Sequence, residues 1–209
     1  MSLGGPAVCV MCLLCVMVLA YTQAWDTCIS RVPLAEYLRV ARSGDLVFFR
    51  AREVDLVHDL VSGFTHVGVV FRGPGEDARV LEIRGGDEFR GGQPGVSAHA
   101  LGRRVEEFDG AVCIAPVKSA VDARRLAGAF GALKRSSYPD RLRMHVAGCS
   151  LWPAYRVPGD VMMCSEFALR LLGAAGGMRV GWRCQTPVDV MAACQRTGEY
   201  GCALEIDAR

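Results

Sequence analysis

The chain has no asparagine, and its only lysines are Lys118 and Lys134 among 209 residues. Without asparagine there is no acceptor for N-glycosylation, and no asparagine amide can orient a catalytic imidazole. The positive charge comes almost wholly from arginine, and the formal net charge is only +2 and evenly spread. We therefore expect no nucleic-acid partner. A GC-rich coding sequence explains the arginines without any recognition role.

The sequence also lacks the spacing of a metal site. Its only CxxC spacings, between Cys9 and Cys12 and between Cys12 and Cys15, fall in an apolar segment where lipid-facing or core residues are the better explanation, and no Cys/His cluster has zinc spacing, so we expect no metal and no cofactor. Cys9, Cys12 and Cys15 lie in an apolar segment. The other seven are Cys28, Cys113, Cys149, Cys164, Cys184, Cys194 and Cys202. An odd number permits three disulfides and one free thiol in an oxidising compartment, and equally permits unpaired core cysteines.

Residues 1–25 carry no charged side chain, and Ala7–Ala20 is a continuous apolar run of 14 residues. This run is short for a membrane span and typical of the central region of a signal peptide. No basic residue precedes it, and extended to Trp25 it also suits a membrane anchor. A buried helix is a third alternative. We favour secretion or membrane association through residues 1–25, without deciding on cleavage, and a single domain over 26–209.

Apolar periodicity and turn residues predict an α+β domain with a small, mainly antiparallel sheet. The expected helices cover 33–42, 54–62, 121–133 and 164–172, with a last one that starts at Thr186; the expected strands cover 46–50, 66–72, 79–83, 96–101, 111–116 and 201–206. A turn over 73–77 makes a hairpin of two of these strands. We expect the strand over 201–206 at a sheet edge, and loops over 85–95 and 134–160.

Three residues in this frame could act together as a base, an orienting group and a nucleophile. His66 opens a strand, Glu82 lies on its hairpin partner, and Cys164 begins an apolar helix. A helix N-terminus and a nearby imidazole both favour a thiolate, and the amide of Cys164 could donate to an oxyanion. Glu82 could accept a hydrogen bond from the second imidazole nitrogen and fix its tautomer.

Each of these residues also has an ordinary structural explanation. A histidine at a strand end is usually a packing residue, Glu82 would face solvent on an alternating strand, and Cys164 would be a small buried hydrophobe. The other histidines, His58, His99 and His145, lie in weaker contexts, and His145 is the best substitute base. Glu166 should point away from Cys164. The combination of the three residues favours a catalytic role over the separate explanations.

Four motifs in order resemble the permuted papain-like amidases: Gly44–Phe49 (GDLVFF), Thr65–Val70 (THVGVV), Val80–Glu82 (VLE) and Met163–Phe167 (MCSEF). These are the circularly permuted NlpC-type proteins of the YiiX/YebB kind, a group with a poxvirus branch. The resemblance covers roughly 43–173, and Tyr138-Pro139-Asp140 resembles the Tyr-Asp element before the family's cysteine. Met163 stands where a tyrosine is common.

The resemblance implies a circularly permuted papain-like fold with His66, Glu82 and Cys164 as catalytic residues. We expect a thiol hydrolase that attacks a peptide, amide or lipid acyl bond through an acyl-enzyme. An acyltransferase is less favoured, because its relatives carry Asn-Cys-Glu-His-Phe at the nucleophile. One alternative is a catalytically silent, membrane-attached or secreted protein that binds a lipid or protein in the same cleft. Another is a secreted disulfide scaffold. The sequence gives no oligomeric state.

Overall fold

The computed structural model describes residues 30–52, 64–85, 94–119, 121–138, 161–178 and 186–208. Residues 1–25, the helix predicted over 54–62, and most of the loops over 85–95 and 134–160 lie outside these ranges. The targeting or anchoring role of the apolar segment therefore stays a prediction. Within the described ranges, no helix has the length and hydropathy that crossing a membrane requires.

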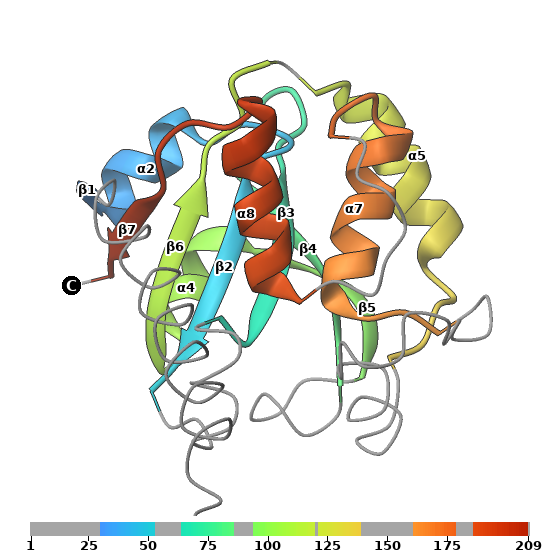
Figure 1. The fold of residues 1–209 in the computed structure, drawn as a ribbon, viewed down its shortest axis with the longest axis horizontal. Helices are drawn as coiled ribbons and strands as arrows, with labels where there is room; N and C mark the ends of the chain where they lie inside the picture. Colours follow the sequence, from blue (N-terminus) through green and yellow to red (C-terminus); the bar gives the residue numbers. More distant parts are fainter. Residues whose placement is uncertain are drawn as a thin grey trace, which may run out of the picture.

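A seven-stranded mixed sheet forms the centre of the molecule (Figure 1). In chain order its strands are β1 (Ser30–Pro33), β2 (Leu46–Ala51), β3 (His66–Phe71), β4 (Arg79–Arg84), β5 (Gly95–Ala100), β6 (Gly110–Ala115) and β7 (Leu204–Asp207). Their order across the sheet is β1-β7-β6-β2-β3-β4-β5. The pair β1 and β7 is parallel, and the other five pairs are antiparallel. The predicted α+β class is confirmed.

Helices cover both faces of this sheet (Figure 1). The described part of the chain has five: α2 (Leu34–Val40), α4 (Leu101–Glu106), α5 (Ala123–Leu133), α7 (Cys164–Ala174) and α8 (Pro187–Thr197). The first hydrophobic core joins α5, α7 and α8 to one face, where Val67 and Val69 point. The second joins α2 and α4 to the other face, where Val47 and Phe49 point. The sheet is therefore the middle of three layers, and each layer boundary is apolar.

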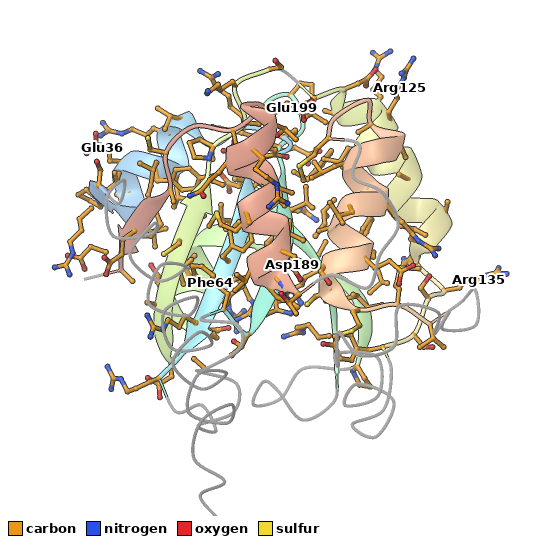
Figure 2. All side chains as sticks on the ribbon, in the orientation of Figure 1. Glu36, Phe64, Arg125, Arg135, Asp189 and Glu199 are labelled. Atoms are coloured by element: carbon orange, nitrogen blue, oxygen red, sulfur yellow. The ribbon has the colours of Figure 1, made fainter. Side chains whose placement is uncertain are left out.

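Local signals predicted most of these elements, and the last helix shows why. Thr186 accepts a hydrogen bond from the amide of Asp189, and the Asp189 side chain accepts one from the amide of Thr186. Pro187 takes the first helical position, where its missing N–H costs nothing. Asp189 lies at the start of α8 in Figure 2. A reciprocal capping box of this kind can be recognised from four residues.

Three features differ from the prediction, and each depends on contacts far apart in the sequence. The strand near the C-terminus is not an edge strand, because β7 lies between β1 and β6. The edge position belongs to β1, which was not predicted and which pairs with β7 across the length of the chain. The helix α4 was also missed, since it begins at Leu101, the last residue of a predicted strand, without any side-chain cap.

The Gly44-Asp45 pair starts β2 for two physical reasons. Gly44 has φ of +100°, and a Cβ there would come within 2.4 Å of the Val121 side chain, so only glycine fits. The buried Asp45 carboxylate accepts hydrogen bonds from the Tyr37 hydroxyl at 2.7 Å and from two backbone amides, those of Arg42 and Val117, at 3.0 and 2.8 Å. Asp45 thus joins α2, the start of β2 and the end of β6.

Replacing Asp45 with alanine should strongly destabilise the fold. The substitution leaves the buried Tyr37 hydroxyl, the buried Val117 amide and the partly buried Arg42 amide without their acceptor. At about 1 kcal/mol for each lost bond, we expect a loss of about 3 kcal/mol in the free energy of unfolding. Denaturant titration would measure it. Asp109→Ala is the matched control, because Asp109 is exposed and its side chain forms, among the described residues, a surface ion pair with Arg52. Equal effects of the two substitutions would contradict this account of Asp45.

Candidate functional site

The three residues singled out in the sequence meet where β3 begins and β4 ends. His66 is the first residue of β3, and Thr65 fixes the strand start because its amide and hydroxyl both donate to the carbonyl oxygen of Phe49, at 2.8 and 3.1 Å. His66 lies opposite Phe49 in the register of β2 and β3. The rings of these two residues are 5.6 Å apart between centroids. The imidazole is completely buried.

His66 and Glu82 form a direct buried contact, with His66 Nε2 2.8 Å from Glu82 Oε2. Gly68 makes room for this contact, because a Cβ on it would come 2.5 Å from the Val80 side chain and 3.5 Å from the Glu82 Cβ. The glycine two residues after the histidine therefore lets β4 lie close enough for its carboxylate to reach the imidazole. The glycine in the motif Thr65–Val70 is therefore required by the close approach of β3 and β4 that brings Glu82 to His66.

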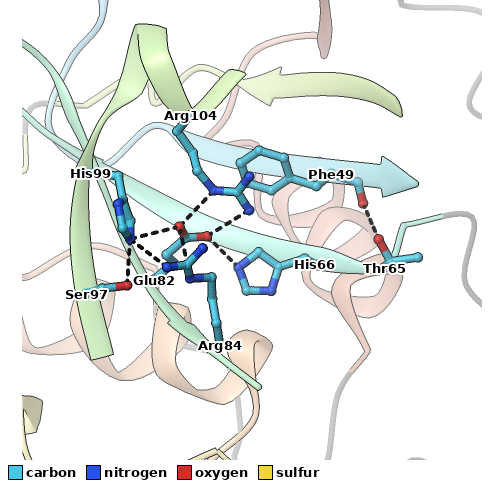
Figure 3. A network of polar contacts seen from close by, with 8 residues as sticks. All are labelled: Phe49, Thr65, His66, Glu82, Arg84, Ser97, His99 and Arg104. Carbon is cyan, nitrogen blue, oxygen red and sulfur yellow. Dashed lines mark hydrogen bonds and ion pairs between the residues drawn. The ribbon is translucent and has the colours of Figure 1, made fainter. Parts of the chain in front are cut away.

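A buried arginine that was not singled out in the sequence binds the same carboxylate (Figure 3). Arg104, on α4, donates from Nε to Glu82 Oε1 at 2.8 Å and from Nη2 to Oε2 at 3.3 Å. Its guanidinium lies over the Phe49 ring, 4.4 Å from the centroid, and 5.6 Å from the centroid of Phe108. The only sequence signal was an arginine in a short segment beside apolar residues, and α4 itself was not predicted.

Two further groups surround Glu82 at longer range. Arg84 Nε lies 3.7 Å and His99 Nε2 lies 3.8 Å from Glu82 Oε1. His99 Nε2 is also 3.0 Å from Arg84 Nη2 and 2.9 Å from the Ser97 hydroxyl. Since the guanidinium can only donate, His99 Nε2 accepts from it and the proton of the neutral ring is on Nδ1. Burial, with the charge of Arg84 beside it, lowers the pKa of His99.

Cys164 reaches His66 from the other layer of the molecule. It is the first residue of α7, is buried, and packs in the first core with residues of β3 and β4. The segment before it is fixed by a β-bridge between Ser137 and Val161 and by the Met162 amide, which donates to the Ser137 carbonyl at 3.0 Å. The Cys164 sulfur lies close enough to His66 to interact electrostatically with its imidazole. Because Nε2 is bound to Glu82, a proton exchanged with the thiol would be carried by Nδ1.

These contacts define the charges of the pair. Burial alone would lower the pKa of His66, but the charge and hydrogen bond of Cys164, with those of Glu82, raise it to about 10. Burial alone would raise the pKa of Glu82, but its hydrogen bond and charge interaction with His66, followed by those with Arg104, lower it to about 2. Glu82 is therefore a carboxylate at neutral pH, and its interaction with His66 favours the protonated imidazole.

The other candidate residues are placed as follows. Glu166 forms an ion pair with Arg170 one turn along α7, at 2.6 Å, as expected for a side chain that does not serve Cys164. Tyr138 lies beside the end of β4, where a Cβ on Gly85 would come 3.1 Å from its ring. The remaining candidates lie outside the described residues: His58, His145, Pro139 and Asp140.

The cysteines do not form the framework of three disulfides considered above. Cys113, Cys164, Cys194 and Cys202 are all free thiols. Three of the seven cysteines after residue 25 then remain, so at most one pair is left and that alternative is wrong. Burial raises the pKa of Cys113 to about 11 and that of Cys194 to about 12, as expected for inert core thiols. Among the described residues, no group of His, Cys, Asp and Glu side chains is arranged to hold a metal ion.

No family model and no curated protein matches the chain. One solved structure to which it is similar is that of the metalloprotein YiiX from Escherichia coli O157:H7. The two share 17% sequence identity with a TM-score of 0.47, and the match covers 78% of this chain and 87% of that one. At this level of similarity, the role of each residue here depends on the contacts described above.

The ion pair of His66 and Glu82 should make stability depend on pH in both directions. The stabilisation from His66 is complete below pH 6.5 and is lost as the pH rises through 10. The stabilisation from Glu82 is complete above pH 4.5 and is lost as the pH falls towards 2. We therefore expect the free energies of unfolding of the wild type and Glu82→Gln to differ most between pH 4.5 and 6.5.

Denaturant titration across the pH range would measure this difference. Glu107→Gln is the matched control, because Glu107 is exposed and its ion pair among the described residues is with Arg103 on the surface. Its stability should follow that of the wild type at every pH. A constant difference between the wild type and Glu82→Gln from pH 3 to pH 9 would contradict the proposed charges of the pair.

Proposed function

We propose that the chain is a cysteine hydrolase that uses Cys164 as nucleophile, His66 as general base and acid, and Glu82 as the group that orients His66. The observation that carries this proposal is the position of His66, which has the Glu82 carboxylate on Nε2 and the Cys164 thiol on its other side. In a catalytic triad the nucleophile contacts the base and the base contacts an orienting group, as Cys164, His66 and Glu82 do in this proposal. The reaction class is acyl transfer to water from an amide, ester or thioester.

The steps follow from the contacts. His66 takes the proton of the Cys164 thiol, and the sulfur forms a bond to the substrate carbonyl carbon. The oxygen of the tetrahedral intermediate is negative, and the first-turn amides of α7, which have no acceptor within the helix, are suited to stabilise it. The bond to the leaving group then breaks, and His66 gives that group the proton. Water resolves the thioester in the same way, with His66 taking one water proton and returning it to the sulfur.

The chain order also supports this function. His66 and Glu82 precede Cys164 by nearly a hundred residues, whereas the cysteine comes first in conventional papain-like enzymes. The arrangement of a nucleophile at a helix start against a histidine on a sheet is the one expected of a circularly permuted papain-like (NlpC-type) fold. We include that fold in the proposal. The substrates that suit the site are a peptide, another amide or a lipid acyl group.

Acylation of cysteine-to-alanine variants should test whether Cys164 is the nucleophile. The exposed Cys202 is a free thiol that can react nonspecifically, so the experiment starts from Cys202→Ala. Incubation with activated ester, amide and thioester probes should add one acyl group, detected by intact-protein mass spectrometry. Adding Cys164→Ala should abolish the adduct, and His66→Ala should slow its formation by at least about a thousand-fold, because both remove a member of the triad.

Two outcomes would overturn the proposal. An acyl adduct that persists without Cys164 would mean that another group is the nucleophile. A folded Cys202→Ala protein that no probe acylates would favour the second class, a binding protein that uses the same place for a lipid or protein partner. Circular dichroism and thermal unfolding of each variant show whether a lost adduct reflects a lost fold.

A further inference from the structure

We propose that Arg104 is a positioning residue for the triad: it fixes the plane of the Glu82 carboxylate and thereby the orientation of His66 towards Cys164. This inference rests on the proposed function for its kinetic consequence. Its structural part, that Arg104 holds Glu82, stands on the contacts alone. Arg104 is on α4, at a distance in the chain from every residue of the triad.

The geometry of the guanidinium supports this role. If His66 alone donated a hydrogen bond to it, the Glu82 carboxylate could still rotate about the terminal bond of its side chain. Arg104 occupies both oxygens of Glu82, through Nε on Oε1 and Nη2 on Oε2. The rigid fork of two donors therefore fixes the carboxylate plane, which a single point charge such as lysine cannot do. With the plane fixed, Oε2 is held 2.8 Å from His66 Nε2.

Arg104 is itself held on the aromatic side. Its guanidinium lies 4.4 Å above the Phe49 ring, and Phe49 is the residue directly opposite His66 in the sheet. Phe108 closes the other flank, with its ring in an edge contact with that of Phe49. Because Phe49 contacts both the imidazole and the guanidinium, it sets their relative positions. Phe49 and Phe108 thus hold Arg104, Arg104 holds Glu82, and Glu82 orients His66.

No other described group takes the place of Arg104. The titratable groups around Glu82 are His66 on β3, Arg84 on β4, His99 on β5 and Arg104 on α4. Arg84 and His99 are 3.7 and 3.8 Å from Glu82 Oε1, which is beyond hydrogen-bond distance, and they contact each other at 3.0 Å. Arg84 contributes positive charge and the neutral His99 ring contributes none, whereas Arg104 supplies directed hydrogen bonds to Glu82.

The kinetic comparison uses three substitutions on the full chain, and a fourth, Arg104→Gly, serves for chemical rescue. Thermal unfolding of each variant shows whether it folds. Arg104→Gln removes the charge and the fork. Arg104→Lys keeps the charge and most of the buried stem but removes the fork and the flat stacking surface, and it serves if the first variant does not fold. Arg103→Gln is the matched control, because Arg103 is the exposed neighbour on the same helix and, within the described residues, its side chain binds Glu107 on the surface.

We expect both Arg104 variants to lower kcat roughly 10- to 100-fold with little change in KM, less than the loss of about 10⁴ on disabling an orienting carboxylate. Arg103→Gln should keep the wild-type kcat. The second readout needs no activity: NMR of a ¹³C-labelled Glu82 carboxyl should show its pKa rise from about 2 in Arg104→Gln, since the ion pair that favours the carboxylate is lost. Guanidinium ion at low concentration should partly restore kcat to Arg104→Gly, and ammonium should not.

Three results would overturn the inference. These are wild-type kcat in both Arg104 variants, an unchanged Glu82 titration, or an equal loss in Arg103→Gln, which would assign the effect to helix stability. Failure of the proposed function is recognised separately, as acylation that does not depend on Cys164. In that case the Glu82 titration still decides whether Arg104 holds the carboxylate.

Discussion

The buried carboxylate of Glu82 is the constraint on which the site depends. A negative charge without water is very unfavourable unless it is paired and its oxygens are hydrogen-bonded. Here the partners are His66 from the neighbouring strand and Arg104 from a helix on one face of the sheet. Removing either partner would weaken the pairing of this buried charge and take away a hydrogen bond to its oxygens, so β3, β4 and α4 must fold together around this point. The same contacts that make the burial tolerable also orient the imidazole.

The site is formed where two layers of the molecule meet. The histidine, the carboxylate and the arginine belong to the face covered by α4, which is packed with Phe49 and its neighbours. The sulfur of Cys164 comes from α7, on the other face, and approaches at the end of the sheet. His66 and Cys164 are the first residues of β3 and α7, and Glu82 and Arg104 lie within β4 and α4. Regular secondary structure therefore gives the fixed orientation that nucleophile activation requires. Small changes in how the layers pack would therefore change the distance between thiol and imidazole.

The sequence predicted those features whose cause is local. The capping box at Thr186 and the turn between β3 and β4 depend on residues within a few positions of each other, and both were recognised. The proximity of His66 and Glu82 followed from the hairpin. Arg104 could not be recognised, because the helix that carries it has no capping signal and its role exists only once α4 packs against β4. The parallel pairing of β1 with β7 joins the two ends of the described chain, and no local pattern encodes it.

By itself the sequence determined the fold class, the hairpin and the three reactive residue types, since hydrophobic period and turn chemistry are properties of short segments. Only the tertiary structure decided that Glu82 is buried rather than exposed, that its second partner is Arg104, and that Cys164 contacts the imidazole from the opposite layer. The physical reason is that charge burial is set by what packs around a group. For Glu82 those neighbours come from β3, β5 and α4, which are brought together only by the complete fold.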